Sequence, residues 1–353
     1  MNAQSTENAP KILKESKNKI KVDFERTNAW TRFRIKYLSW NFVGKIVWWF
    51  FRLVLLLGIS YVILLPFYTK IASSFMAKED FVDATVKLIP KHFTLDTYRA
   101  VITENKYFEA LLNTTILSVA CGLLQTFICS LIGYGFAKYN FKGKKLLFAL
   151  VVFTMVVPHQ TLRLSMFMKF RYFDVFYILK LLGGGLIPGL KLIPITELKL
   201  TNTFVPLILL SLTGLGFKNG LYIFIMRQFF NGVPDELEES AYIDGCSTLR
   251  TFFTIILPIS IPMMITIFLF AFSWQWTDNF YTKAFFTSSS KITLMPNIVK
   301  IPKKLDTSYA AQNLYTAAIR NTCSLLIIAP LIVVYLFCQR YLVQGIERSG
   351  IVG

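Results

Sequence analysis

The chain has 353 residues, of which 54% are hydrophobic, 16% aromatic and only 16% charged, and its formal net charge is +18. Soluble domains carry about 25% charged residues, so this composition disfavours a soluble protein and favours a membrane protein. The positive charge does not indicate nucleic-acid binding, because much of it lies in an N-terminal arm that lacks the pattern of a folded basic domain.

Residues 1–45 are predicted to form a basic, disordered arm in the cytoplasm. Basic residues that flank the first membrane span hold that end of the chain inside the cell. Eleven of them lie before or at the start of the first apolar run: Lys11, Lys14, Lys17, Lys19, Lys21, Arg26, Arg32, Arg34, Lys36, Lys45 and Arg52. This run begins too late for a cleaved signal peptide, so we expect it to stay as a span.

The apolar residues cluster into runs long enough to cross a bilayer as helices. None of the runs alternates as the strands of a membrane β-barrel do. We therefore predict an all-α integral membrane protein with about six transmembrane helices and both termini in the cytoplasm. The six runs lie near 46–69, 110–137, 146–168, 203–226, 255–276 and 317–339.

The predicted organisation follows from these runs. Residues 46–106 would form the first transmembrane helix and an outer loop, and residues 107–339 the main transmembrane domain. Residues 340–353 would form a cytoplasmic tail.

Sequence patterns for catalysis and cofactor binding are missing. The only two histidines, His92 and His159, have no ligand or catalytic spacing, and the five cysteines form no C-x-x-C pair. Gly183-Gly184-Gly185 is not followed by the Lys-Ser/Thr of a nucleotide-binding loop. We expect no enzyme activity, metal or cofactor in this chain. An ion gradient or another chain must then drive any active transport, and the scarcity of carboxylates in the spans disfavours ion coupling.

A polar segment at 231–258 separates the fourth run from the fifth. Pro234, followed by Asp235 and Glu236, favours a helix start. Asp244-Gly245 would end or bend this helix, because glycine tolerates positive φ. Ser247 can cap a second helix, whose cytoplasmic part would end at Pro258, where the chain leads into the fifth span. The pattern predicts a short helix-turn-helix that either fits a groove on a partner or lies as an amphipathic loop on the membrane surface.

The 231–258 segment resembles the EAA loop of binding-protein-dependent ABC importer permeases. That pattern is E-A-A, three residues, Gly, nine residues and I-x-L-P. It is matched here by Glu239-Ser240-Ala241, Gly245, Ile255 and Leu257-Pro258, with Ser240 in place of the first alanine. The resemblance implies a type I ABC importer permease fold and a docking surface for an ATPase. The docking residues it implies are Glu239, Ala241, Asp244, Gly245, Leu249, Phe252, Phe253 and Pro258.

The resemblance covers nearly all of the chain after residue 60. Within the family, the chain is most similar to the carbohydrate-uptake permeases, in particular to the maltose-type subunit with the shorter outer loop. One departure is an insert of about 25 residues near 174–199, which is apolar and interrupted by Gly and Pro. The stretches that carry the resemblance are LIPKHFTLDTYRAVI (88–102), FEALLNT (108–114), YGFAKYNFKGKKLL (134–147), IFIMRQFF (223–230) and QRYLVQGIERSGIVG (339–353).

Membership of this family implies several partners in the cytoplasmic membrane. They are a second homologous permease subunit, two ATPase subunits that bind ATP and Mg, and an extracellular or periplasmic solute-binding protein. ATPase closure would move the 231–258 segment and rock the spans between inward and outward states.

Residues that contact the solute are harder to place from the sequence. Side chains with the aromatic faces and polar edges that a sugar needs lie where the fifth span leaves the membrane, although Trp at this position is more often a headgroup anchor. Asn113, Gln125 and Gln160 would either line the path or join helices by hydrogen bonds. The candidate path residues are Trp274, Gln275, Trp276, Asp278 and Asn279.

Two alternatives remain open at this level. One is a permease of the same architecture for another solute, such as a peptide or a polyamine. The other is a membrane channel or scaffold without ATP coupling.

Overall fold

The computed structural model describes residues 40–174, 178–182, 198–216, 218–287, 290–308 and 311–350. Most of the expected N-terminal arm and of the insert near 174–199 lies outside these ranges, as do residues 351–353 of the tail. The chain divides into two compact units, residues 1–69 and 70–353, and each is considered by itself.

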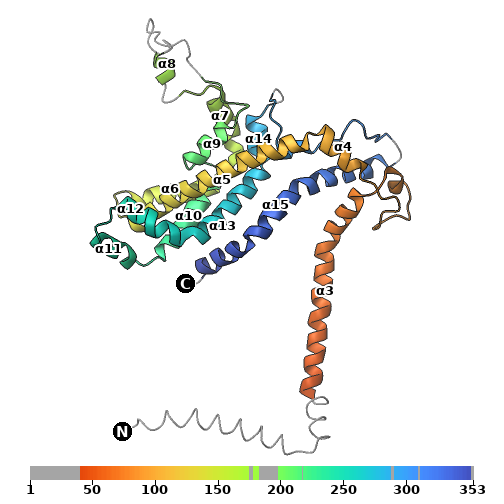
Figure 1. Cartoon of the computed structure of the whole chain (residues 1–353), viewed down its shortest axis with the longest axis horizontal. Helices are drawn as coiled ribbons and strands as arrows, with labels where there is room; N and C mark the ends of the chain where they lie inside the picture. Colours follow the sequence, from red (N-terminus) through yellow and green to blue (C-terminus); the bar gives the residue numbers. More distant parts are fainter. Residues whose placement is uncertain are drawn as a thin grey trace, which may run out of the picture. The chain divides into compact units, whose positions relative to one another are not determined.

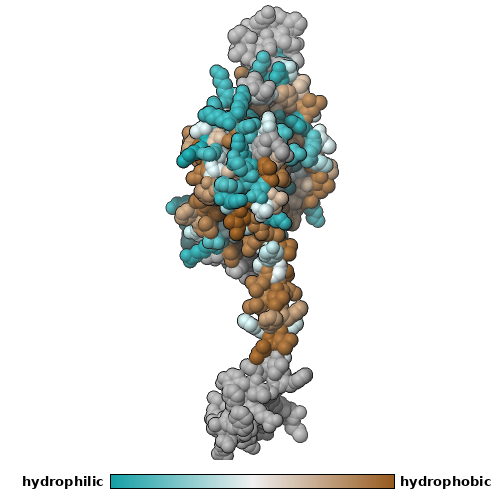
Figure 2. All heavy atoms as spheres, turned by 90° about the vertical axis from the view of Figure 1, so that its right-hand side faces the viewer, coloured by the Kyte–Doolittle hydropathy of each residue, from teal (hydrophilic) through white to brown (hydrophobic). Residues whose placement is uncertain are grey.

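The first unit consists, in its described part, of most of helix α3 (Trp40–Ser74). At 1.5 Å rise per residue its 35 residues extend about 50 Å, more than the hydrocarbon thickness of a bilayer. Figure 2 shows a mostly hydrophobic surface along this helix. Such a surface suits a helix that contacts lipid, and it agrees with the span predicted at 46–69.

The second unit is almost entirely helical within its described residues (Figure 1). Two isolated antiparallel bridges, Met76 with Phe93 and Phe173 with Leu198, are the extended pairings seen there. Its larger helices are α4 (Asp96–Glu104), α5 (Tyr107–Lys138), α6 (Lys144–Val156), α7 (His159–Arg171), α9 (Val205–Leu212), α10 (Asn219–Asn231), α11 (Glu236–Ile243), α13 (Leu257–Trp276) and α15 (Gln312–Gly350). Its shorter ones are the 3-10 helices η1 (Lys78–Phe81) and η3 (Met295–Ile298), the π-helix η2 (Phe252–Ile256), and α8 (Ile178–Leu182), α12 (Thr248–Thr251) and α14 (Phe280–Phe285).

Four of the six apolar runs form helices long and apolar enough to cross a membrane by themselves, among the described residues. The third run forms α6 and α7, which are bent by 100° at Val157-Pro158. Val157 has the extended backbone that a residue before proline prefers, which explains the break. The fourth run forms α9 and α10, separated by a turn in which Gly214 and Lys218 have positive φ. Each of these two runs is therefore interrupted, which the sequence did not indicate.

The core of the second unit is a bundle in which α5 packs against α10 and α13 (Figure 1). A Cβ built at Gly133 of α5 would lie 2.6 Å from the Cβ of Met226 in α10, so only glycine permits this close approach. The buried Gln125 side chain donates to Ser211 Oγ at 3.0 Å. Gln125 therefore joins α5 to α9, one of the two roles considered for it.

Candidate functional site

The 231–258 segment forms the predicted helix-turn-helix. Its first helix, α11, begins at Glu236, directly after Pro234 and Asp235. Three glutamates occupy the first turn, where the positive end of the helix dipole stabilises negative charge: Glu236, Glu238 and Glu239. Figure 1 shows α11 at the end of the bundle, beside α12.

Gly245 ends α11 in a Schellman motif. The Cys246 N–H donates to the Ala241 carbonyl at 2.9 Å, and the Gly245 N–H donates to the Tyr242 carbonyl at 3.0 Å. Gly245 has φ +78°, the left-handed conformation that this motif requires. No atom lies within 4 Å of a Cβ built at Gly245, so backbone conformation alone selects glycine at this position.

The second half of the segment leads into the fifth span at Pro258, as predicted, and Pro258 does not interrupt the helix. Helix α12 passes through the π-helix η2 into α13, where Pro258 lies in the first turn. Proline lacks an N–H and crowds the carbonyl four residues earlier, and the wider π-helical turn relieves both problems. Ser247 occupies the N-cap position of α12 in extended conformation, as predicted, although its side chain makes no capping hydrogen bond there.

The structure divides the predicted docking residues into two groups. Ala241 and Phe252 are buried and hold the segment against the bundle. Leu249 and Phe253 are 66% and 48% exposed, and the remaining residues predicted for docking are also exposed: Glu239, Asp244, Gly245 and Pro258.

Phe252 anchors the segment through aromatic contacts. Its ring centroid lies 4.8 Å from that of Tyr134 in α5, and Tyr134 lies 5.5 Å from Phe230 at the end of α10. Phe252 is 1% exposed. Three separate elements therefore meet at this cluster, so the position of the 231–258 segment depends on the positions of α5 and α10.

Lys138, in the last turn of α5, forms a second anchor that we call the Lys138 clamp. Its side chain is 7% exposed, and its Nζ donates to the Val233 carbonyl and to Asp235 Oδ1, each at 2.5 Å. Glu238 Oε1 lies 3.8 Å from the same Nζ. Burial raises the pKa of the Glu238 carboxyl, and the Lys138 ammonium opposes this shift. The clamp thus joins the end of α5 to the start of α11 by charge.

Sequence reasoning did not single out Lys138 or Ile243 for this site. Ile243 is 86% exposed at the tip of α11. One signal was present for Ile243, because it does not share the helix face of Leu237 and Ala241, which are spaced i, i+4. Lys138 had no comparable local signal, since its partners lie about a hundred residues away along the chain.

The residues predicted near the end of the fifth span do not form one surface. Trp276 is buried and donates from Nε1 to the Ile327 carbonyl of α15 at 3.0 Å, so it is not a headgroup anchor. Asp278 accepts backbone N–H groups of Phe280, Tyr281 and Thr282 at 3.0–3.2 Å and thereby caps α14. Trp274 is exposed, with the Lys218 ammonium 5.1 Å from its ring centroid. Asn279 is exposed and Gln275 is half-buried.

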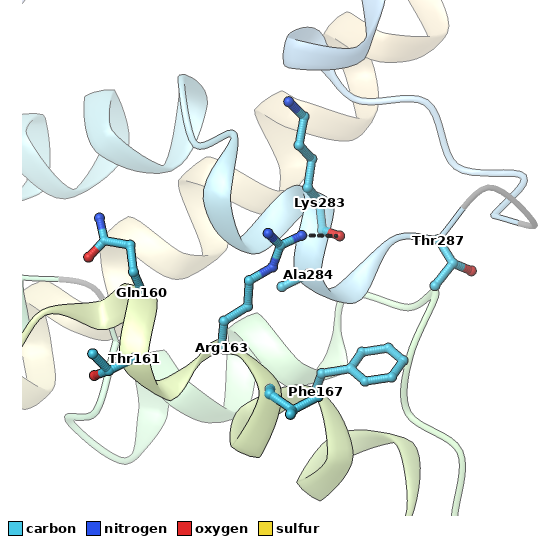
Figure 3. A pocket seen from close by; sticks show the side chains of 8 residues that line it. Gln160, Thr161, Arg163, Phe167, Lys283, Ala284 and Thr287 are labelled. Carbon is cyan, nitrogen blue, oxygen red and sulfur yellow. Dashed lines mark hydrogen bonds between the residues drawn. The ribbon is translucent and has the colours of Figure 1, made fainter.

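A cavity of about 530 Å³ lies between α7 and α14, near Gln160 (Figure 3). It is at the far end of α13 from the 231–258 segment, about 30 Å away by the length of that helix. Its lining residues are Gln160, Thr161, Arg163, Leu164, Phe167, Lys283, Ala284 and Thr287. Within the described ranges, no group of three or more His, Cys, Asp or Glu side chains could hold a metal ion.

Residues 129–348 match the family described as binding-protein-dependent transport system inner membrane component. The chain belongs to this family. The match includes the 231–258 segment and both of its anchors, Lys138 and Phe252. This inner membrane component is therefore part of a transport system that works with a binding protein, and the predicted family is confirmed.

Curated relatives of this inner membrane component are permease subunits. It is 28% identical to the polygalacturonan/rhamnogalacturonan transport system permease protein YtcP of Bacillus subtilis (strain 168), over 84% of this chain and 96% of that protein. It is 25% identical to the arabinooligosaccharides transport system permease protein AraQ of Halalkalibacterium halodurans, over 84% of this chain and 93% of that protein. It is 29% identical to the alpha-glucoside transport system permease protein AglG of Rhizobium meliloti (strain 1021), over 75% of this chain and 62% of that protein.

The fold of this inner membrane component is similar to that of a chain in a bacterial ABC transporter involved in the import of the acidic polysaccharide alginate. The TM-score is 0.61 at 18% identity, over 84% of this chain and 97% of the other. This likeness confirms the predicted ABC importer permease fold.

Proposed function

We propose that this chain is the permease subunit of an ATP-driven importer for a sugar or oligosaccharide and that separate ATPase subunits drive it. Family membership supports the importer, and the names of the relatives support a saccharide as its solute. Those names include an acidic polysaccharide as well as glucosides and arabinooligosaccharides, so they leave the charge of the solute open.

One observation carries the proposed coupling role. The 231–258 segment exposes large apolar side chains, Ile243 and Leu249, at the tip of an element that two anchors hold rigidly. Burying such side chains in a partner's groove would contribute about 1.5–3 kcal/mol each. Rigid anchoring means that movement of a partner bound there would be transmitted to α5, α10 and α13 instead of being absorbed by the loop.

The orientation and the partners follow from this role. The segment would face the cytoplasm, where ATPase subunits bind ATP and Mg, and both termini would lie on the same side. A second homologous permease would complete the solute path, and a solute-binding protein would deliver the sugar from outside. Glu239 and Asp244, both exposed on the segment, would meet basic groups of the ATPase.

The test is co-purification and uptake in the assembled complex. Ile243→Asp places a charge on the proposed contact and should abolish both ATPase association and sugar uptake. Ile89→Asp is a matched control, because Ile89 is also an exposed isoleucine (73%) but lies in the loop between α3 and α4. Retained ATPase association with the Ile243→Asp chain would contradict the coupling role.

A further inference from the structure

The cavity between α7 and α14 presents one face of α7 to its interior. Gln160, Arg163, Leu164 and Phe167 are spaced i, i+3, i+4, i+7, so all four lie on the same side of the helix. Figure 3 shows Arg163 extending from α7 to α14, with Phe167 on the same helix. One turn beyond Phe167 on the same helix, Phe170 is buried against Phe285 with ring centroids 5.2 Å apart, and this contact fixes the end of α7. The lining residues of α7 are thus held on a rigid element.

The cavity is positively charged. Arg163 and Lys283 line it, and none of the lining residues in the described part of the chain is a carboxylate. The guanidinium of Arg163 donates to the Lys283 carbonyl at 3.4 Å and lies 5.8 Å from the Phe280 ring centroid, and both of these groups are neutral. A further guanidinium, that of Arg171, lies 5.9 Å from the ring of Phe167.

Asp278, near the start of α14, does not neutralise this charge by an ion pair. Both of its carboxylate oxygens accept backbone N–H groups of α14. Among the described residues, no ion pair within 4.0 Å includes Arg163 or Lys283. The cavity therefore has room for an anion and cations to bind it.

We propose that this cavity binds a carboxylate-bearing sugar residue, so that the importer takes acidic oligosaccharides such as those built from uronic acids. A guanidinium binds a carboxylate through two parallel N–H donors, an arrangement that a neutral sugar cannot use. The ring of Phe167 offers an apolar face for the C–H groups of a pyranose, and Gln160 and Thr161 offer hydrogen bonds for its hydroxyls. This inference rests on the proposed sugar import and adds the charge of the sugar.

The position of the cavity suits the entry of the solute. It lies at the end of α13 opposite the 231–258 segment, hence on the outer side if that segment faces the cytoplasm. A sugar released by the binding protein would meet this cavity before the membrane interior. Positive charge there raises the local concentration of an anionic solute.

The experiment uses the assembled complex in nanodiscs without the solute-binding protein. Saturation-transfer NMR compares trigalacturonate with a neutral trisaccharide of galactose at low and high salt. We expect a signal from the acidic sugar that weakens with salt, and a loss of about tenfold in its affinity in Arg163→Gln. The control Lys87→Gln removes one positive charge from the loop between α3 and α4 and should leave the signal unchanged.

Three outcomes would overturn the inference: equal signals for the two sugars, equal losses for both in Arg163→Gln, or an unchanged signal in that variant. Uptake measured with the complete transporter and its binding protein distinguishes a failure of the acidic-sugar inference from a failure of the proposed sugar import. Uptake of neutral oligosaccharides alone would reject only the acidic solute. A complex that hydrolyses ATP and takes up no saccharide of either kind would reject sugar import itself, and the inference with it.

Discussion

The Nζ of Lys138 lies 2.5 Å from Asp235 Oδ1, although the two residues are 97 positions apart in the chain. Lys138 ends α5, and Asp235 immediately precedes α11. This ion pair, together with the nearby Glu238, ties the proposed docking element directly to a membrane span.

Replacing Lys138 by Met should weaken this tie. Asp235 is 76% exposed, so losing its ion pair with Lys138 costs little stability. Glu238, in contrast, would remain buried without a cation. We expect a loss of about 1–3 kcal/mol in stability and more ATP hydrolysed per sugar imported. Thermal unfolding and the ATP-to-sugar ratio would measure the two effects. Lys138→Arg should restore coupling, and Lys142→Met, at an exposed lysine, should change neither quantity. An unchanged ratio in Lys138→Met would show that the clamp is not needed for coupling.

Replacing Gly245 by Val should uncouple ATP hydrolysis from uptake. The left-handed backbone at this position costs a side chain with Cβ about 1–2 kcal/mol, while the space around it is open. Gly245→Asn is the control, because asparagine tolerates this conformation better. Normal uptake in Gly245→Val, measured in proteoliposomes, would count against a fixed turn as part of the coupling mechanism.

Replacing Trp276 by Phe should lower stability without changing the KM for the sugar. The substitution removes the hydrogen bond to the Ile327 carbonyl between α13 and α15 and leaves a small cavity. We expect a loss of about 1–3 kcal/mol, visible as a lower Tm. A raised KM at unchanged Tm would instead support the direct sugar contact predicted from the sequence.

The loop that follows α3 should keep its structure at neutral pH and lose it only in strong acid. Burial of Asp80 raises the pKa of its carboxyl, but hydrogen bonds from His92 and Lys91 outweigh this effect, and the net pKa is lowered. A lowered acid pKa stabilises the folded loop above the ordinary pKa of 3.8, and this stabilisation disappears as the pH falls through the lowered value. The protection factors for amide hydrogen exchange of residues 78–93, which compare the observed rate with the intrinsic rate at the same pH, should therefore be constant from about pH 5 to 8.

The variant Asp80→Asn tests the same point at neutral pH. It removes the negative charge that accepts the Lys91 and His92 N–H groups at 3.1 and 3.0 Å. Amide exchange in this loop should then accelerate at pH 7, whereas Asp96→Asn, at an exposed aspartate of α4, should have no effect on it. Identical exchange in Asp80→Asn and the unaltered chain would disprove the role of Asp80.

The sequence by itself determined the membrane class, the positions of the apolar runs and the helix-turn-helix at 231–258. These features depend on local chemistry. The length of an apolar run decides whether it can cross the membrane, Pro234 and three glutamates start α11, and Gly245 ends that helix. The spacing of Glu239, Gly245 and Pro258 is also a local feature of the sequence. It indicated the family, which the match over residues 129–348 confirms.

Only the tertiary structure decided which side chains of that segment are anchors and which are exposed. Lipid, a neighbouring helix and a partner's groove are all apolar surroundings, so hydrophobicity alone cannot distinguish Phe252 from Leu249 or a buried Trp276 from a headgroup anchor. The Lys138 clamp and the cationic cavity at Arg163 each join residues distant in the chain. Pairings of that kind come from helix packing, which no local pattern encodes.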